Sequence, residues 1–232
     1  MNGQRILFGI IGLVAGFIGG FILANSINRN TPAQVLPNQA QLAENAPLSP
    51  AQNPAQITAQ MPDVTEALER AKNEPNNFDA QMKVGDMYAT IDRFDKAVEF
   101  FANAQKIKPS DYQAIIKLGN ANFEINNSAE AEKWYSKALE IKPDDVNVRS
   151  DLGLTFYKKQ PSDLDRAIKE YEAALAINPN HEPTLQNLTV AYWDKKDALA
   201  MQATLEKLEK VNPQNQVVPK LKQELELLKQ SK

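Results

Sequence analysis

The amino-acid sequence predicts an all-α protein of stacked helix pairs, preceded by one membrane-spanning helix and a disordered linker. Five prolines recur at nearly equal separations: Pro75, Pro109, Pro143, Pro179 and Pro213. Three glycines, Gly85, Gly119 and Gly153, recur at the same separation. A repeated period of about 34 residues is typical of repeat proteins, in which each unit is one supersecondary motif. The third observation is an apolar run from Ile6 to Ala24.

Residues 1–5 form a short amino-terminal tail, and residues 6–24 are predicted to be a membrane anchor. The run from Ile6 to Ala24 lacks any polar side chain, and a helix of that length spans about 28 Å, close to the hydrocarbon thickness of a bilayer. The alternative is a cleavable signal peptide, because Ala24-Asn25-Ser26 resembles a cleavage site. The apolar run is longer than that of most signal peptides, which favours a retained anchor.

The charges that flank this segment predict its orientation. Arg5 precedes the apolar run, and Arg29 is the only basic residue in the linker that follows it. Positive charge favours the cytoplasmic side, so we expect a cytoplasmic amino terminus and an exported remainder. The predicted location is therefore the inner membrane of a bacterium, as a single-pass protein with an extracytoplasmic repeat domain.

Three glycines in the anchor, Gly12, Gly16 and Gly20, are evenly spaced so that they share one helix face. Such a stripe allows two membrane helices to approach closely, which would permit a homodimer through the anchor. The alternative is that glycine is simply frequent in membrane helices.

Residues 25–62 are predicted to be a disordered linker. Six of the fourteen prolines of the chain fall here, and Arg29 and Glu44 are the only charged side chains. Because few large apolar residues are present, the segment cannot bury enough surface to offset its ordering entropy. We interpret it as a spacer between the membrane and the repeats.

Residues 78–213 divide into four blocks of two helices each, at 78–111, 112–145, 146–181 and 182–213. Glycine in a helix interior costs about 1 kcal/mol relative to alanine, so we expect Gly85, Gly119 and Gly153 where two helix backbones cross closely. The third block contains two additional residues near Gln160-Pro161-Ser162, which we place in the turn between its helices.

This pattern resembles the tetratricopeptide repeat family. The first block has Val84-Gly85, Tyr88, Ala97, Phe101, Ala104 and Pro109 at the family's signature positions, and the third has Leu152-Gly153, Phe156, Ala167, Tyr171, Ala174 and Pro179. The second block has Asn122 where an aromatic residue is usual, and the fourth has Thr189 in place of the glycine and Met201, Leu205 and Leu208 in its second helix. The resemblance implies a right-handed α-solenoid.

Capping helices are predicted at both ends of the repeats. Val64, Leu68 and Ala71 form an apolar face within residues 63–77. Within residues 214–232, the positions Val217, Leu221, Leu225 and Leu228 form a second apolar stripe. The alternative for this last helix is a coiled-coil or partner-binding role.

The composition argues against catalysis. The chain has no cysteine, one histidine (His181) and no Gly-rich phosphate loop, because its glycines lie in the tail, the anchor and the helix crossings. Asp145 and Asp163 stand at expected helix starts, where carboxylates favour the helix dipole. The net charge of −3 and the absence of a basic stripe argue against a nucleic-acid ligand. We therefore expect no enzymatic activity, no cofactor and no metal site.

The resemblance implies that a protein or peptide partner binds in a concave groove lined by the first helix of each repeat. Chaperone-binding relatives hold a peptide carboxylate with a Lys/Asn/Asn/Lys/Arg clamp, but the matching positions here are Met82, Asp86, Lys117, Asn147 and Asp151. The clamp is absent, and two acidic residues would repel such a peptide.

Other side chains at groove positions remain candidates for partner binding. Phe123, Tyr157 and Trp193 occupy the twelfth position of three successive repeats, and Asn120, Gln186 and Asn187 are polar neighbours. An aromatic ladder of this kind could hold a segment of another protein. The alternative is that the rings pack inside the solenoid.

The sequence thus predicts a membrane-tethered scaffold for protein–protein interaction or envelope complex assembly. Its layout, an amino-terminal anchor followed by repeats, resembles bacterial envelope assembly factors, including the repeat subunits of cytochrome c maturation. A second hypothesis is a purely architectural homo-oligomer without a groove ligand.

Overall fold

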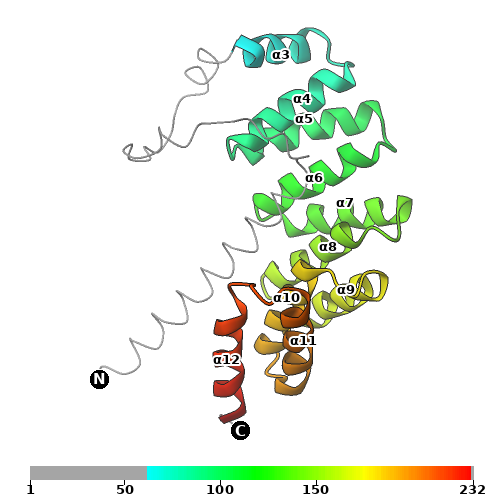
Figure 1. Ribbon diagram of the computed structural model, residues 1–232. Helices are drawn as coiled ribbons and strands as arrows, with labels where there is room; N and C mark the ends of the chain where they lie inside the picture. The colour runs from blue at the N-terminus through cyan, green and yellow to red at the C-terminus, as the bar shows by residue number, and fades with distance from the viewer. Residues whose placement is uncertain (1–61, 231–232) are drawn as a thin grey trace, which may run out of the picture. The chain divides into compact units, whose positions relative to one another are not determined.

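The computed structural model describes residues 62–230, and every regular element within them is an α-helix (Figure 1). The predicted tail, the anchor at residues 6–24 with its three glycines, and residues 25–61 of the linker lie outside the described residues. None of the helices between residues 62 and 230 is long and apolar enough to cross a bilayer.

The helices, labelled as in Figure 1, follow the predicted blocks closely. They are α3 (Pro62–Asn73), α4 (Phe78–Thr90), α5 (Phe94–Ile107), α6 (Tyr112–Glu124), α7 (Ser128–Ile141), α8 (Val146–Lys158), α9 (Leu164–Ile177), α10 (Glu182–Asp194), α11 (Ala198–Val211) and α12 (Val218–Gln230). Each predicted repeat is one helix pair. Helix α3 begins at Pro62, which the sequence pattern assigns to the linker, because proline is well accepted in the first turn of a helix.

The helices belong to two compact units that divide at Pro109. In the first unit α3 packs on α4 and α4 packs on α5. Ala67 and Ala71 of α3 are buried with Ala80 and Val84 of α4, as a capping helix requires. Gln81, 2% exposed, donates its Nε2 hydrogen to the Ala71 carbonyl oxygen over 2.9 Å. Helix α3 is therefore joined to the first repeat by packing and by a buried hydrogen bond.

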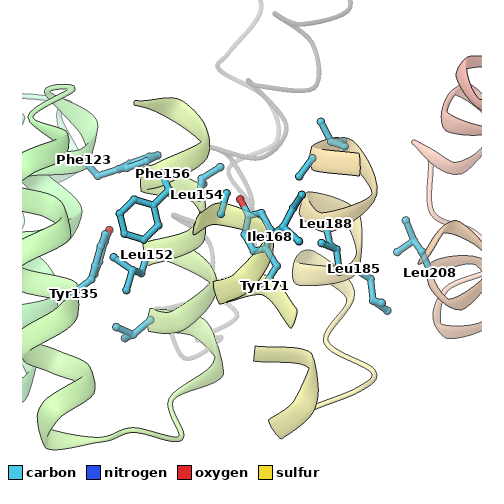
Figure 2. Close-up of a cluster of buried hydrophobic side chains, with 14 of the residues drawn as sticks. Phe123, Tyr135, Leu152, Leu154, Phe156, Ile168, Tyr171, Leu185, Leu188 and Leu208 are labelled. Carbon is cyan, nitrogen blue, oxygen red and sulfur yellow. The ribbon is translucent and has the colours of Figure 1, made fainter. Parts of the chain in front are cut away.

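The second unit begins at Ser110 and contains three helix pairs followed by α12. Its core is a continuous cluster to which α6 through α12 all contribute, and Figure 2 shows its central part. Tyr135 and Tyr171 from the second helices are 2% and 0% exposed, and Phe156 of α8 is 1% exposed. Because each helix pair buries its apolar face on the next pair, stability is shared between neighbours.

The glycines lie at close helix crossings, as predicted. A Cβ atom on Gly153 would lie 2.7 Å from Tyr171 Cε1, and one on Gly119 would lie 2.9 Å from Tyr135 Cε1. In the fourth repeat both residues of this contact differ: Thr189 stands at the glycine position, and Leu205 stands at the position of the aromatic residue. Both of these residues are buried.

The turns within the repeats also follow the sequence. Residues 159–163 connect α8 to α9, whereas the turns within the other pairs are two residues shorter, so the two additional residues lie in this turn. In the shorter turns the middle residue has a positive φ: Asp92 at 57°, Asn126 at 59° and Lys196 at 59°. Asp145 and Asp163 are helix N-caps, and their carboxylates accept hydrogen bonds from Val148 N and Arg166 N.

The last helix covers the fourth repeat. Helix α12 packs on α11 and α10, with Val218, Leu221 and Leu225 buried and Leu228 partly buried. Val217, which the apolar stripe includes in this helix, is buried immediately before it.

The departure of the second repeat from the family pattern is accommodated within its own helix. Asn122, at the position where an aromatic residue is usual, is 3% exposed and donates its Nδ2 hydrogen to the Leu118 carbonyl oxygen over 2.8 Å. The buried amide therefore has a hydrogen-bond partner on α6.

Candidate protein-binding face of the first helices

Among the first helices of the second unit, hydrogen bonds between repeats join α8 to α6 at the amino end and to α10 at both ends. At the amino ends the Tyr112 hydroxyl donates to Asp145 Oδ2 over 2.7 Å, and His181 Nε2 lies 3.0 Å from Asn147 Oδ1. At the carboxyl ends the Tyr157 hydroxyl donates to Asp194 Oδ2 over 2.6 Å. Equivalent positions of successive first helices therefore lie next to one another.

We define the first-helix face by the residues that these helices carry at the predicted groove positions: Asn120, Phe123, Ser150, Leu154, Tyr157, Val190 and Trp193. Phe123 is 9% exposed and belongs to the core, while Tyr157 and Trp193 are partly buried and pack against the same cluster. The ladder thus has one interior ring and two rings that retain exposed surface. Its role in binding stays a prediction.

The three predicted amides differ in their environment. Asn120 is partly exposed and accepts a hydrogen bond from the Tyr135 hydroxyl over 2.8 Å. Gln186 and Asn187 are interior, at 3% and 6% exposed. Gln186 Oε1 lies 3.5 Å from Asn215 Nδ2, on the segment that leads into α12. Of the three amides, Asn120 is therefore the one with surface available to a partner.

Two hydroxyl groups near this face were not predicted from the sequence. Ser150 is 1% exposed and Tyr171 is 0% exposed, and neither the Ser150 Oγ nor the Tyr171 hydroxyl has a hydrogen-bond partner. Tyr171 occupies the same signature position in its repeat as Tyr135. The Tyr135 hydroxyl donates a hydrogen bond to Asn120, but Leu154 stands at the corresponding position beside Tyr171. The sequence signal that could have revealed the unpaired Tyr171 hydroxyl is that Leu154 stands at the repeat position that Asn120 occupies one repeat earlier.

Acidic side chains act electrostatically on the buried tyrosines Tyr171 and Tyr135. Burial raises the pKa of Tyr171 well above its usual value, and the neighbouring Tyr157 and Asp151 raise it further. Burial, followed by Asp151 and Glu124, raises the pKa of Tyr135 in the same way. Both tyrosine hydroxyls therefore stay protonated at neutral pH and can donate hydrogen bonds.

His181 has a structural position. It is the N-cap residue of α10, and its Nδ1 lies 2.6 Å from Thr184 Oγ1. The part of the chain from residue 62 to residue 230 contains no group of three or more histidine, aspartate or glutamate side chains arranged to hold a metal ion.

Successive helix pairs that stack within the second unit, with glycines and alanines at their crossings, define an α-helical repeat protein. A family model described as a tetratricopeptide repeat matches residues 62–112, and a second, described as a TPR repeat, matches residues 119–160. Residues 62–112 and 119–160 therefore carry tetratricopeptide repeats.

Solved structures share this fold. The crystal structure of MamA has a TM-score of 0.56 at 22% identity, over 69% of this chain and 94% of that one. YrrB, described as a TPR protein with an unusual peptide-binding site, has a TM-score of 0.62 at 17% identity, over 73% and 88% of the two chains. A tetratricopeptide repeat protein from Parabacteroides merdae has a TM-score of 0.61 at 16% identity, over 66% and 60%. A search of curated proteins found no match.

Proposed function

We propose that this protein is a membrane-tethered scaffold that binds a segment of another protein at the first-helix face. The observation that carries the proposal is the aromatic residue at the same position of three successive first helices, with exposed surface left on Tyr157 and Trp193. Partly exposed aromatic rings fixed on a rigid support are typical anchors in protein interfaces. The tetratricopeptide repeat assignment and the peptide-binding site described for YrrB support a role in protein binding.

The membrane tether is supported by the sequence of residues 6–24. A retained anchor followed by a spacer at residues 25–62 would hold the repeats away from the bilayer while keeping them near its surface. Such a layout suits a factor that assembles complexes in the bacterial envelope, cytochrome c maturation among the candidate pathways.

Photocrosslinking from within the face tests the binding role. A photoreactive amino acid at position 193 should give a defined adduct with another protein in the native membrane, while the same group at position 134 should not. Trp134 is a matched control because it is also a partly buried tryptophan but lies on the second helix α7. Equal labelling from both positions would argue against this face.

A second candidate function is an architectural homo-oligomer, favoured by the stripe Gly12, Gly16 and Gly20. Crosslinking the full chain in membranes distinguishes the two. Dimers that disappear in Gly16→Leu would support association through the anchor, whereas monomers in both proteins would exclude it. Retention of the chain in membranes after alkaline extraction tests the anchor itself, and release into the supernatant would refute it.

A further inference from the structure

We propose that Asn126 is an acceptor for an N-linked oligosaccharide, which is attached to its side-chain amide in the turn between α6 and α7. The inference rests on the export of the repeats that the proposed function includes, because sugars are transferred to asparagine on the exported side of a membrane. It adds a covalent modification site that lies outside the first-helix face.

The sequence contains two copies of the acceptor pattern. Asn-x-Ser/Thr, with any residue except proline in the middle, marks an asparagine for N-glycosylation. It occurs at Asn126-Asn127-Ser128 and at Asn187-Leu188-Thr189. Because so short a pattern also arises by chance, the surroundings of each asparagine in the fold decide which copy can carry a sugar.

The residue two positions before each asparagine separates the two copies in the sequence itself. Several bacterial enzymes that attach these sugars require an acidic residue at that position. Glu124 occupies it in the first copy, and Leu185 occupies it in the second. The first copy therefore has the longer pattern that suits a protein of the bacterial envelope.

The turn after α6 presents Asn126 to solvent. Asn126 is exposed and has φ 59°, a conformation that asparagine accepts more readily than most residues. The backbone holds this turn, because the Asn126 N–H donates to the Phe123 carbonyl oxygen and the Asn127 N–H donates to the Asn122 carbonyl oxygen, each over 2.9 Å. A sugar on the Asn126 side chain would leave both of these hydrogen bonds intact.

The two groups that a transferase must reach are not engaged by the fold. Neither the Asn126 side-chain amide nor the Ser128 hydroxyl forms a hydrogen bond within residues 62–230. Ser128 is partly exposed, and Asn127 between them is exposed. The neighbouring amide is the one that the fold uses, since Asn127 Nδ2 donates to Asn122 Oδ1 over 3.3 Å.

The second copy has the opposite surroundings. Asn187 is 6% exposed and lies in the interior of α10. Thr189 is 0% exposed, and its hydroxyl donates to the Leu185 carbonyl oxygen over 2.7 Å. An oligosaccharide on Asn187 would not fit without opening the packing of α10, so a chain modified there before folding would not reach this fold. Only the first copy is compatible with the folded repeats.

The same turn recurs in two other repeats without an acceptor. Asp92 and Lys196 occupy the position of Asn126, with φ 57° and 59°. The backbone conformation is therefore common to three turns, and the amide is particular to one. A glycan on this amide would also add polar surface beside Ile125, which is 40% exposed.

The reaction needs a lipid-linked oligosaccharide and a membrane oligosaccharyltransferase. Asn126 Nδ2 forms a bond to the anomeric carbon of the first sugar, and the bond from that carbon to the diphosphate oxygen of the lipid carrier breaks. Polyprenyl diphosphate is the leaving group, and the amide nitrogen loses one proton to a base of the enzyme. No atom is oxidised or reduced.

The experiment uses the full chain purified from the membranes of its own host. Because trypsin cleaves after lysine and arginine, it releases Asn126 in the peptide of residues 118–133 and Asn187 in the peptide of residues 170–195. Mass spectrometry with electron-transfer dissociation then detects an added oligosaccharide and identifies the residue that carries it.

We expect the peptide of residues 118–133 to carry an oligosaccharide on Asn126 and the peptide of residues 170–195 to be unmodified. Ser128→Ala should abolish the modification, because it removes the hydroxyl and leaves Asn126 in place. Ser128→Thr keeps a hydroxyl and should retain the modification. The Tm of both variants should match that of the unmodified sequence, which shows that loss of the sugar in Ser128→Ala does not come from misfolding.

Two results would overturn the inference. A peptide of residues 118–133 that carries no sugar would show that Asn126 is not an acceptor. A modification that survives Ser128→Ala would show that it does not depend on the acceptor pattern.

Labelling of spheroplasts with a membrane-impermeant lysine reagent separates failure of this site from failure of the proposed function. If the lysines of the repeats are labelled while Asn126 carries no sugar, the modification site is wrong and the membrane-tethered binding role stands. If the repeats are protected from the reagent, the export in the proposed function is wrong, and the modification site is wrong with it.

Discussion

The glycine at each helix crossing allows a sharp test of how the repeats are packed. Gly153→Ala adds one methyl group to the interior of α8. In an unconstrained helix this change would stabilise the protein by about 1 kcal/mol, because alanine has the higher helix propensity. In this structure the new Cβ would lie 2.7 Å and 2.8 Å from Tyr171 Cε1 and Cδ1, and 3.2 Å from the Ala167 carbonyl oxygen.

The surrounding atoms cannot easily give way. The Tyr171 ring is 0% exposed, and the Ala167 oxygen belongs to the backbone of α9. Forcing an extra methyl group into a filled core costs about 1–3 kcal/mol, which equals or exceeds the gain in propensity. We therefore expect Gly153→Ala to destabilise the protein by about 0–2 kcal/mol, measured by urea unfolding followed by circular dichroism.

A second substitution isolates the cause. In a Tyr171→Leu background the ring atoms that meet the new methyl group are gone, so Gly153→Ala should there be stabilising by about 0.5–1 kcal/mol. The chain already contains this combination in the fourth repeat, where Thr189 stands opposite Leu205. The double-mutant cycle should show a coupling of about 1–3 kcal/mol. An equal stabilisation by Gly153→Ala in both backgrounds would refute the idea that the ring excludes a side chain.

Three further predictions concern a turn, an ion pair and a titrating group. Lys196 has φ 59°, so Lys196→Gly should stabilise by about 1 kcal/mol in thermal melts, and Asn126→Gly by less, because asparagine tolerates this conformation. The Arg149 guanidinium lies 3.0 Å from Glu170, and the Arg149 side chain is 21% exposed. Glu170→Ala removes this ion-pair partner, so we expect a loss of about 2 kcal/mol in the free energy of unfolding, measured in urea. A loss as small as that of a surface ion pair would contradict this expectation. Burial raises the pKa of Asp194 above its ordinary value of 3.8, although the hydrogen bond from Tyr157 opposes this shift. The folded state therefore binds the Asp194 proton more tightly than the unfolded state does. The resulting stabilisation is present below the raised pKa and is lost as the pH rises through it. Asp194→Asn should therefore be at least as stable as the unmodified protein at pH 7, with the difference shrinking toward pH 4; a difference that grows on acidification would show the opposite sign of the shift.

The repeat architecture of residues 62–230 could be predicted from the sequence because its signals are local and periodic. Prolines end the second helices and glycines mark the crossings, and both depend on steric rules that hold wherever such a residue stands in a helix. The two additional residues in the turn after α8 and the capping helices were predicted on the same grounds. Small departures occur at helix ends, at Pro62 and Val217, because the first residue of a helix is less sharply specified by a sequence pattern than its interior.

The candidate site was less predictable because the burial and the hydrogen bonding of its side chains depend on the residues that adjacent helices bring into contact. Gln186 and Asn187 occupy groove positions in the sequence, but both are buried in α10, and Gln186 lies 3.5 Å from Asn215 on the segment before α12. The unpaired hydroxyl of Tyr171 is visible only after its ring is placed against α8, since the same residue type in Tyr135 finds a partner in Asn120. Polar satisfaction is a property of neighbours in space, and periodicity alone does not report it.

The sequence by itself therefore determined the helix pairs, their order and their close crossings, because a period of about 34 residues repeats the same local constraints in each block. The tertiary structure alone decided which groove-position side chains are interior and which keep a surface. Phe123 is buried while Tyr157 and Trp193 remain partly exposed, although all three occupy one repeat position. The reason is physical: burial depends on the side chains that the adjacent helices bring to the contact, and these differ from one repeat to the next.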